Sequence, residues 1–187
     1  APTTDSFTFY VNDTHQNSTS VTFSLELRAP TTLYVNATDD VVDELGCNES
    51  HCSLREAVLD AGIGDTIAFE LSLPATITLS EENREILIDK DIFIEGPGAD
   101  QLAISGAERD NRGVIVVGNF ESPVTVNISG LTIKDGRGFQ GGGMQLQNGS
   151  TLTMTDCVIG PNNIVTYAGG GVFNEGSHLT LNRCTVT

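Results

Sequence analysis

"VTVNISGLTI" (residues 124–133) is followed by two segments of the same pattern, "STLTMTDCVIG" (150–160) and "SHLTLNRCTVT" (177–187). Apolar residues recur at matching positions first 26 and then 27 residues later, as in the series Val126, Leu152 and Leu179. Within each segment they alternate with Thr, Ser or Asn, the pattern of a strand with one buried face. A strand that returns at such an interval indicates a solenoid of stacked coils.

The segments that link these strands contain glycine runs, "GGGM" (141–144) and "GGGV" (169–172). A phosphate-binding loop would need Lys followed by Ser or Thr after the glycines, and neither run has that pair. We therefore expect tight corners, where glycine tolerates positive φ and close stacking. Leucine-rich repeats and propeller blades fit less well, because their leucine frame and their unit length differ. The sequence predicts an all-β fold, a right-handed parallel β-helix of about 26–27 residues per coil.

Three more series of residues should stack in the core of neighbouring coils. They are Ile128, Met154 and Leu181; Leu131, Cys157 and Cys184; and Ile133, Ile159 and Val186. Parallel side chains one coil apart hold their Cβ atoms too far apart for a relaxed disulfide. We therefore expect Cys157 and Cys184 to remain buried thiols.

One segment, "GCNESHCSLREAVLDA" (46–61), has a helical pattern instead. Ser53 and Glu56 have the spacing of a capping box, and an apolar stripe follows, formed by Leu54, Ala57, Val58 and Ala61. So short a helix is marginal alone in water, so its stripe must lie on something apolar. We predict a cap on the N-terminal end of the β-helix, formed by Ser53, Leu54, Glu56, Ala57 and Val58.

Two cysteines, Cys47 and Cys52, stand at the entrance to this helix. Their spacing suits a disulfide that closes a small loop. A zinc site would use both cysteines together with His51, but no further ligands stand at a convincing spacing. We therefore predict a Cys47–Cys52 disulfide and no resident metal or other cofactor, although the acidity of the chain weakly suggests Ca²⁺.

The first 30 residues differ from the rest of the chain. "SFTFYV" (6–11) places Phe7, Phe9 and Val11 on one face of a strand, and "SVTFSLELRA" (20–29) does the same with Val21, Phe23, Leu25 and Leu27. We predict an amphipathic β arm or hairpin over residues 1–30, a cap region over 31–79 and β-helix coils over 80–187. Because an isolated two-stranded unit is marginal, the arm needs an apolar partner, either its own β-helix or a neighbouring molecule.

Composition restricts the partners and the location. The formal net charge of -16 argues against nucleic acid and against an anionic membrane surface, and no apolar run is long enough to span a membrane. Six Asn-x-Ser/Thr sequons suggest N-glycosylation, at Asn12, Asn17, Asn36, Asn48, Asn127 and Asn148. The first residue is Ala1 rather than Met, which fits a processed N-terminus. We expect an extracellular or cell-surface protein.

The segment over residues 33–70 resembles the CSLREA segment of exported prokaryotic surface proteins. The resemblance rests on Cys52-Ser53-Leu54-Arg55-Glu56-Ala57, preceded by Cys47, and on the continuation into "ATITLS", "DIFIEGPGADQLAISG" and "VTVNISGLTI". It implies a right-handed β-helix and an exported location. It implies no activity, because such proteins share no catalytic motif. Most of them are also much longer than this chain.

The sequence favours a structural role over catalysis. Asp39, Asp40, Asp43 and Glu44 form the densest acidic run, which we interpret as solvated surface, and the three histidines are scattered. The chain ends within a strand whose core positions need cover, from a longer product or from another subunit. We expect a non-enzymatic structural protein that assembles head-to-tail into filaments through its coil ends and its arm. The alternative is a monomeric adhesin that binds surface glycans, or a fragment of one.

Overall fold

The computed structural model describes residues 3–11, 19–108, 111–118 and 122–187. The chain divides into two compact units, Ala1–Pro30 and Thr31–Thr187. The first contains an antiparallel hairpin of β1 (Thr3–Val11) and β2 (Thr19–Leu27), whose backbone register pairs Phe7 with Phe23. Of the two forms expected for the arm, the hairpin is the one observed. The sequons at Asn12 and Asn17 lie outside the described residues.

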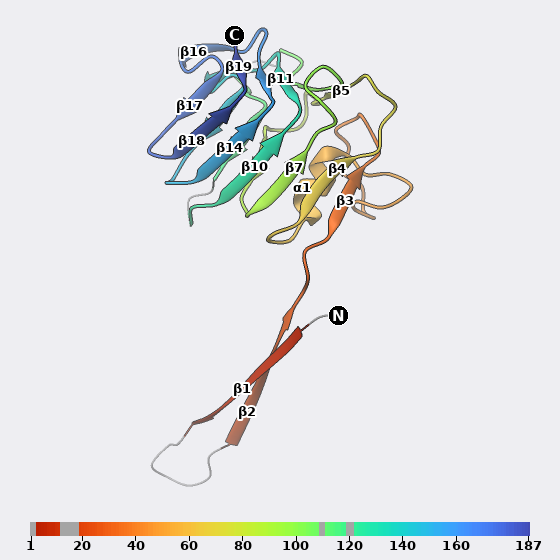
Figure 1. Cartoon of the computed structure of the whole chain (residues 1–187), viewed down its shortest axis with the longest axis vertical. Helices are drawn as coiled ribbons and strands as arrows, with labels where there is room; N and C mark the ends of the chain where they lie inside the picture. Colours follow the sequence, from red (N-terminus) through yellow and green to blue (C-terminus); the bar gives the residue numbers. More distant parts are fainter. Residues whose placement is uncertain (1–2, 12–18, 109–110, 119–121) are drawn as a thin grey trace. The chain divides into compact units, whose positions relative to one another are not determined.

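The second unit is a parallel β-helix of about four turns, as the repeats predicted. Its largest face is a six-stranded sheet, visible in Figure 1 as a row of adjacent arrows from β18 to β3. In chain order this sheet contains β3 (Thr32–Val35), β4 (Thr66–Phe69), β7 (Ile92–Glu95), β10 (Thr125–Ser129), β14 (Thr151–Thr155) and β18 (His178–Asn182).

Two further sheets form the other faces of the coil. The five-stranded sheet contains β5 (Ala75–Thr78), β8 (Leu102–Ser105), β11 (Thr132–Lys134), β15 (Val158–Ile159) and β19 (Thr185–Val186). The four-stranded sheet contains β6 (Ile86–Ile88), β9 (Ile115–Val117), β13 (Met144–Leu146) and β17 (Val172–Asn174). In the later coils a short pair, β12 (Arg137–Gln140) and β16 (Ile164–Ala168), lies between these two faces in the sequence.

Inward side chains stack in continuous columns from coil to coil. In the six-stranded sheet, one column runs through Leu33, Ile67, Ile94, Ile128, Met154 and Leu181. In the five-stranded sheet, another runs through Ile77, Ile104, Ile133, Ile159 and Val186. These registers confirm the predicted alignment of the repeats. Cys157 and Cys184 are free thiols, as expected, but only Cys157 is buried, because Cys184 belongs to the last coil.

The glycine runs form corners, as predicted. Gly141 and Gly169 adopt φ values of +63° and +73°, which residues with a Cβ atom rarely adopt. The middle glycine is required for a different reason, because a Cβ atom on Gly142 would lie 2.7 Å from the carbonyl oxygen of Gly170 on the next coil. Backbone hydrogen bonds join the two runs, with the Gly143 N–H donating to the Gly170 oxygen at 3.0 Å.

The α-helix, α1 (Leu54–Asp60), packs against β3 and β6, the first strands of two faces. Parallel pairing already begins at Thr32, with β3 against β4, well before the predicted start of the coils at residue 80. The cap segment is therefore inserted into the first coil rather than preceding it. No helix of the described chain is long and apolar enough to cross a membrane.

A core substitution tests the stacking. Ile133 is fully buried between Ile104 and Ile159, so Ile133→Ala should lower the free energy of unfolding by about 2 to 5 kcal/mol through lost burial and the cavity left behind. Val158, on the outer side of the next strand and only partly buried, provides the control. Urea unfolding should show a much smaller effect of Val158→Ala, and equal effects would contradict the observed alternation.

Candidate functional site

An extended network of polar contacts lies in the cap segment, residues 36–61. A disulfide joins Cys47 and Cys52, whose Cα atoms are 4.2 Å apart, as the sequence predicted. Inside this loop the Asn48 side-chain oxygen accepts hydrogen bonds from the Ser50 and His51 N–H groups at 2.9 and 3.3 Å. The loop is thus fixed at its ends and in its interior, which holds His51 in one place.

The capping box forms at the start of α1. The Ser53 hydroxyl oxygen accepts from the Glu56 N–H at 3.2 Å, and Glu56 Oε2 accepts from the Ser53 N–H at 2.8 Å. The Ser53 hydroxyl also donates to the carbonyl oxygen of Val41 at 2.7 Å. Leu54, Ala57 and Val58 are buried in the core.

A second network ties the helix to the coils through Arg55. The guanidinium donates to both carboxylate oxygens of Asp40, at 2.8 and 3.0 Å, and to the carbonyl oxygens of Arg84 and Glu85. Asp40 is buried, with its side chain 1 % exposed. Its Oδ2 also accepts from the Ser80 N–H at 3.0 Å. This ion pair therefore joins three segments far apart in the sequence.

Each residue of the CSLREA signature now has a physical role in the cap. Cys52 forms the disulfide, Ser53 and Glu56 form the capping box, and Arg55 forms the buried ion pair. The remaining two, Leu54 and Ala57, are 1 % and 0 % exposed and pack in the core. The signature accounts for how the chain closes the end of its β-helix.

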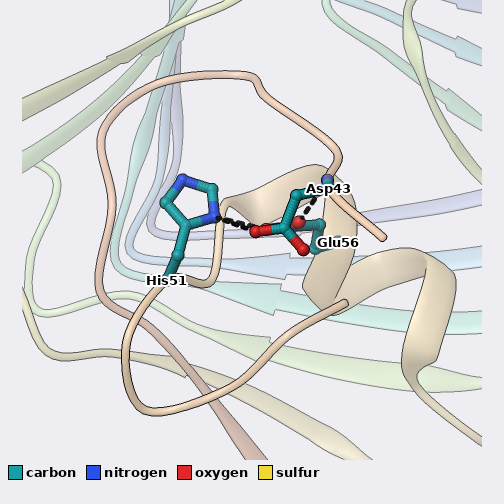
Figure 2. A group of neighbouring side chains, drawn as sticks. All are labelled: Asp43, His51 and Glu56. Atoms are coloured by element: carbon teal, nitrogen blue, oxygen red, sulfur yellow. Dashed lines mark hydrogen bonds and ion pairs between the residues drawn. The ribbon is translucent and has the colours of Figure 1, made fainter. Parts of the chain in front are cut away.

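Three acidic side chains surround His51, and Figure 2 shows two of them, Asp43 and Glu56. Its Nε2 lies 3.1 Å from Asp39 Oδ1, while its Nδ1 lies 3.0 Å from Glu56 Oε2 and 3.8 Å from Asp43 Oδ2. Glu56 comes from α1 and is buried, with its side chain 1 % exposed, whereas Asp39 and Asp43 come from the preceding loop and face solvent. Nδ1 itself is buried and makes no hydrogen bond of acceptable geometry.

This environment raises the pKa of His51. Burial acts against the charged imidazolium and lowers the pKa, but the hydrogen bond to Asp39 and the negative charges of Asp39, Glu56 and Asp43 together outweigh it. The imidazole is therefore a favoured position for a positive charge.

The structure brings together residues that the sequence interpretation had kept apart. The sequence predicts three scattered histidines and a solvated acidic run, but residues of that run surround His51 and pair with Arg55. Asp40 and Arg55 were not predicted as site residues. The sequence did contain a signal for this cluster. The acidic run and the signature are separated only by the loop that the disulfide closes, so they must lie close together.

The sequons lie in different settings. The Asn36 side-chain amide donates to the carbonyl oxygens of Asn48 and Glu49, both at 3.1 Å, and the Asn48 amide donates to Gly46 at 2.8 Å. A glycan on the Asn36 nitrogen would remove one of the two donor hydrogens that this network uses. Asn127 lies on β10, and Asn148 lies in a turn with a φ of +59°. Glycosylation at these sites stays a prediction.

The buried ion pair gives a direct mutational test. Arg55→Ala would leave the Asp40 carboxylate buried and unpaired, so we expect the free energy of unfolding to fall by about 3 to 5 kcal/mol. The exposed pair of Arg183 and Asp156 has the same two-bond geometry on the surface, so Arg183→Ala is a matched control that should change stability little. Chemical denaturation of the two variants measures the difference. Similar effects would show that burial of Asp40 is unimportant.

The second test is the pH dependence of stability. Because the folded-state pKa of His51 is raised above its ordinary value, the stabilisation is fully present below about pH 6.5 and is lost as the pH rises through the folded-state pKa. In metal-free buffer, the free energy of unfolding of the natural chain should therefore decline across this range relative to that of His51→Gln. Parallel curves for the two proteins would contradict the role assigned to His51.

Comparisons with known proteins do not identify a family for this chain. No protein-family model, no curated protein and no solved structure matches the chain. The resemblance to the CSLREA segment therefore stays a prediction from its motif, and the function must be argued from the structure itself.

Proposed function

We propose that this chain is a non-enzymatic structural module of a prokaryotic cell surface, exported and assembled head-to-tail. The parallel β-helix supports such a role because it is a rigid, elongating architecture. The disulfide supports an oxidising location outside the cell. Arg55 and His51, the main basic groups of the cap, are both paired with acidic side chains of the same segment. Such pairing favours a structural role for these side chains over a catalytic one.

The observation that carries the proposal is the continuous stacking of apolar columns from coil to coil, because each coil needs a layer to cover it. The core column of the six-stranded sheet is fully buried at Met154, but its next member, Leu181, is 39 % exposed. In the five-stranded sheet the change is from 0 % at Ile159 to 50 % at Val186. Apolar columns of this kind are stabilised when another layer covers them, whether a further coil or a second molecule.

The two ends of the β-helix are not equivalent. At the N-terminal end α1 packs on β3 and β6, so two bare coil ends cannot simply stack on each other. The hairpin is the element left to contribute strands, with nine residues in each of β1 and β2. We infer that the hairpin of one molecule adds to the last coil of the next, a heterologous contact that generates a filament unless a ring closes.

A second candidate, glycan binding by a monomeric adhesin, rests on the outer side of the six-stranded sheet. One row of in-register residues there runs through Thr32, Thr66, Phe93, Asn127, Thr153 and Thr180. Phe93 is 42 % exposed, and Tyr34 in the adjacent row is 49 % exposed. Hydroxyl and amide groups beside exposed rings are the means by which a flat surface binds polar, ring-shaped ligands.

Sedimentation velocity tests assembly. The natural chain should form species larger than the monomer, and more so as salt screens the repulsion between subunits of net charge -16. Deletion of residues 1–29 should abolish these species, and so should Leu181→Asp, which places a charge in the contact. Thr180→Asp is the matched control, because Thr180 is the exposed neighbour on the outer side of the same strand and should leave assembly intact.

Two outcomes would contradict assembly through the core columns. A natural chain that stays monomeric at high protein and salt concentrations would contradict assembly and leave glycan binding as the better proposal. Loss of assembly in Thr180→Asp as strong as in Leu181→Asp would show that the core columns are not the contact.

A further inference from the structure

The orientation of His51 is the first of two observations that point beyond the proposed role. Asp39 lies within hydrogen-bond distance of Nε2, at 3.1 Å, which in the neutral imidazole places the proton on Nε2 and leaves the Nδ1 lone pair free. That lone pair lies among the carboxylate oxygens of Glu56 and Asp43. Lone pairs facing carboxylates repel each other unless a cation lies between them.

The second observation is the charge balance. Glu56 is buried, and the only basic side chain of the described residues within ion-pairing distance of it is His51. Arg55, the nearest guanidinium in sequence, is directed at Asp40 instead. Three carboxylates thus share a single imidazole. Buried carboxylates are stable in proteins when they are paired or when they coordinate a metal ion.

We propose that Asp43, His51 and Glu56 form a binding site for Zn²⁺. Their ligand atoms, Oδ2, Nδ1 and a carboxylate oxygen, lie within 4.8 Å of one another. Ligands of a tetrahedral zinc ion lie about 3.3 Å apart, given the usual metal–ligand lengths. The separations of Nδ1 from Glu56 and Asp43, 3.0 and 3.8 Å, fall on either side of this value. Water from the exposed side of Asp43 would supply the fourth ligand.

The surroundings hold the ligands in place before a metal arrives. Glu56 accepts hydrogen bonds from the Asp43 and Ser53 N–H groups, both at 2.8 Å, which fix its carboxylate. Asp43 uses Oδ1 for the Leu45 N–H, at 2.7 Å, so Oδ2 is the atom available to a metal. Asp39 acts as the carboxylate that orients a metal-binding histidine through its other nitrogen, a frequent arrangement in zinc proteins.

The ligand set selects the metal. One imidazole nitrogen and two carboxylate oxygens suit Zn²⁺ and other late divalent transition metals. Ca²⁺ requires six to eight oxygen ligands, and Mg²⁺ binds oxygens in octahedral geometry, so neither should compete well at this site. The metal proposed for this site is therefore zinc rather than the Ca²⁺ that the acidity of the chain weakly suggested. The two cysteines are not ligands, because they form the disulfide.

Isothermal titration calorimetry of the full chain with Zn²⁺ alone tests the proposal, together with the shift in melting temperature. One Zn²⁺ per chain should bind at near-neutral pH in the presence of a large excess of Ca²⁺ and should raise the melting temperature. His51→Gln and Asp43→Asn should abolish both effects. Asp39→Asn should weaken binding by about 10- to 100-fold, because it removes only the orienting partner. Asp43 lies at the surface, so its variant is the one least able to disturb folding.

His178→Gln is the matched control, because His178 is exposed on β18 and should not affect binding. Replacement of zinc by Co²⁺ gives an independent readout, since a tetrahedral site produces a strong visible absorption that Asp43→Asn should remove. Absence of zinc binding by the natural chain would overturn the proposal and leave a proton on Nδ1 as the sole cation of the cluster. Binding that Ca²⁺ displaces, or that survives His51→Gln, would equally overturn it.

Discussion

A stack of parallel coils must leave its first apolar layer uncovered unless another element closes it, and this requirement organises the N-terminal half of the chain. The helix α1 provides the cover, but its seven residues could not stay folded alone. Its position depends on the buried pair of Arg55 and Asp40, which ties it to the coils, and on the disulfide, which fixes its entrance. The regular columns of the later coils continue from a first layer that is held in this way.

The repeats made the later coils predictable because each strand combines two independent signals, the alternation of apolar residues and the interval at which they return. Both signals report local burial, so the registers of Val126 with Leu152 and Leu179 followed directly. The start of the β-helix was harder, because the inserted cap separates β3 from β4 and removes the regular interval between these two paired strands. The His51 cluster was hidden for a similar reason. Two of its carboxylates, Asp39 and Asp43, come from a loop whose path depends on Asp40. The pairing of a buried Asp with a distant Arg has no periodic pattern in the sequence.

The cap combines stabilising and binding chemistry in the same side chains. Glu56 completes the capping box and also faces His51, so any change in the charge near His51 acts on the start of α1. A cation at this position, whether a proton or a metal ion, would tighten the contact between the loop and the helix. In the coil of β18 and β19, by contrast, the ion pair of Arg183 with Asp156 lies at the surface, and Leu181 and Val186 are exposed apolar side chains.

The register between coils also affects how such a protein can change in length during evolution. Because the coil of β14 and β15 stacks on that of β10 and β11 with matched positions, inserting or removing one whole coil preserves the neighbours of every remaining layer. The cap would not need to be altered, since α1 packs on β3 and β6, the first strands of two faces. Duplication of the gene segment that encodes one coil could therefore lengthen the protein in the C-terminal direction, and each product of such a duplication would still fold.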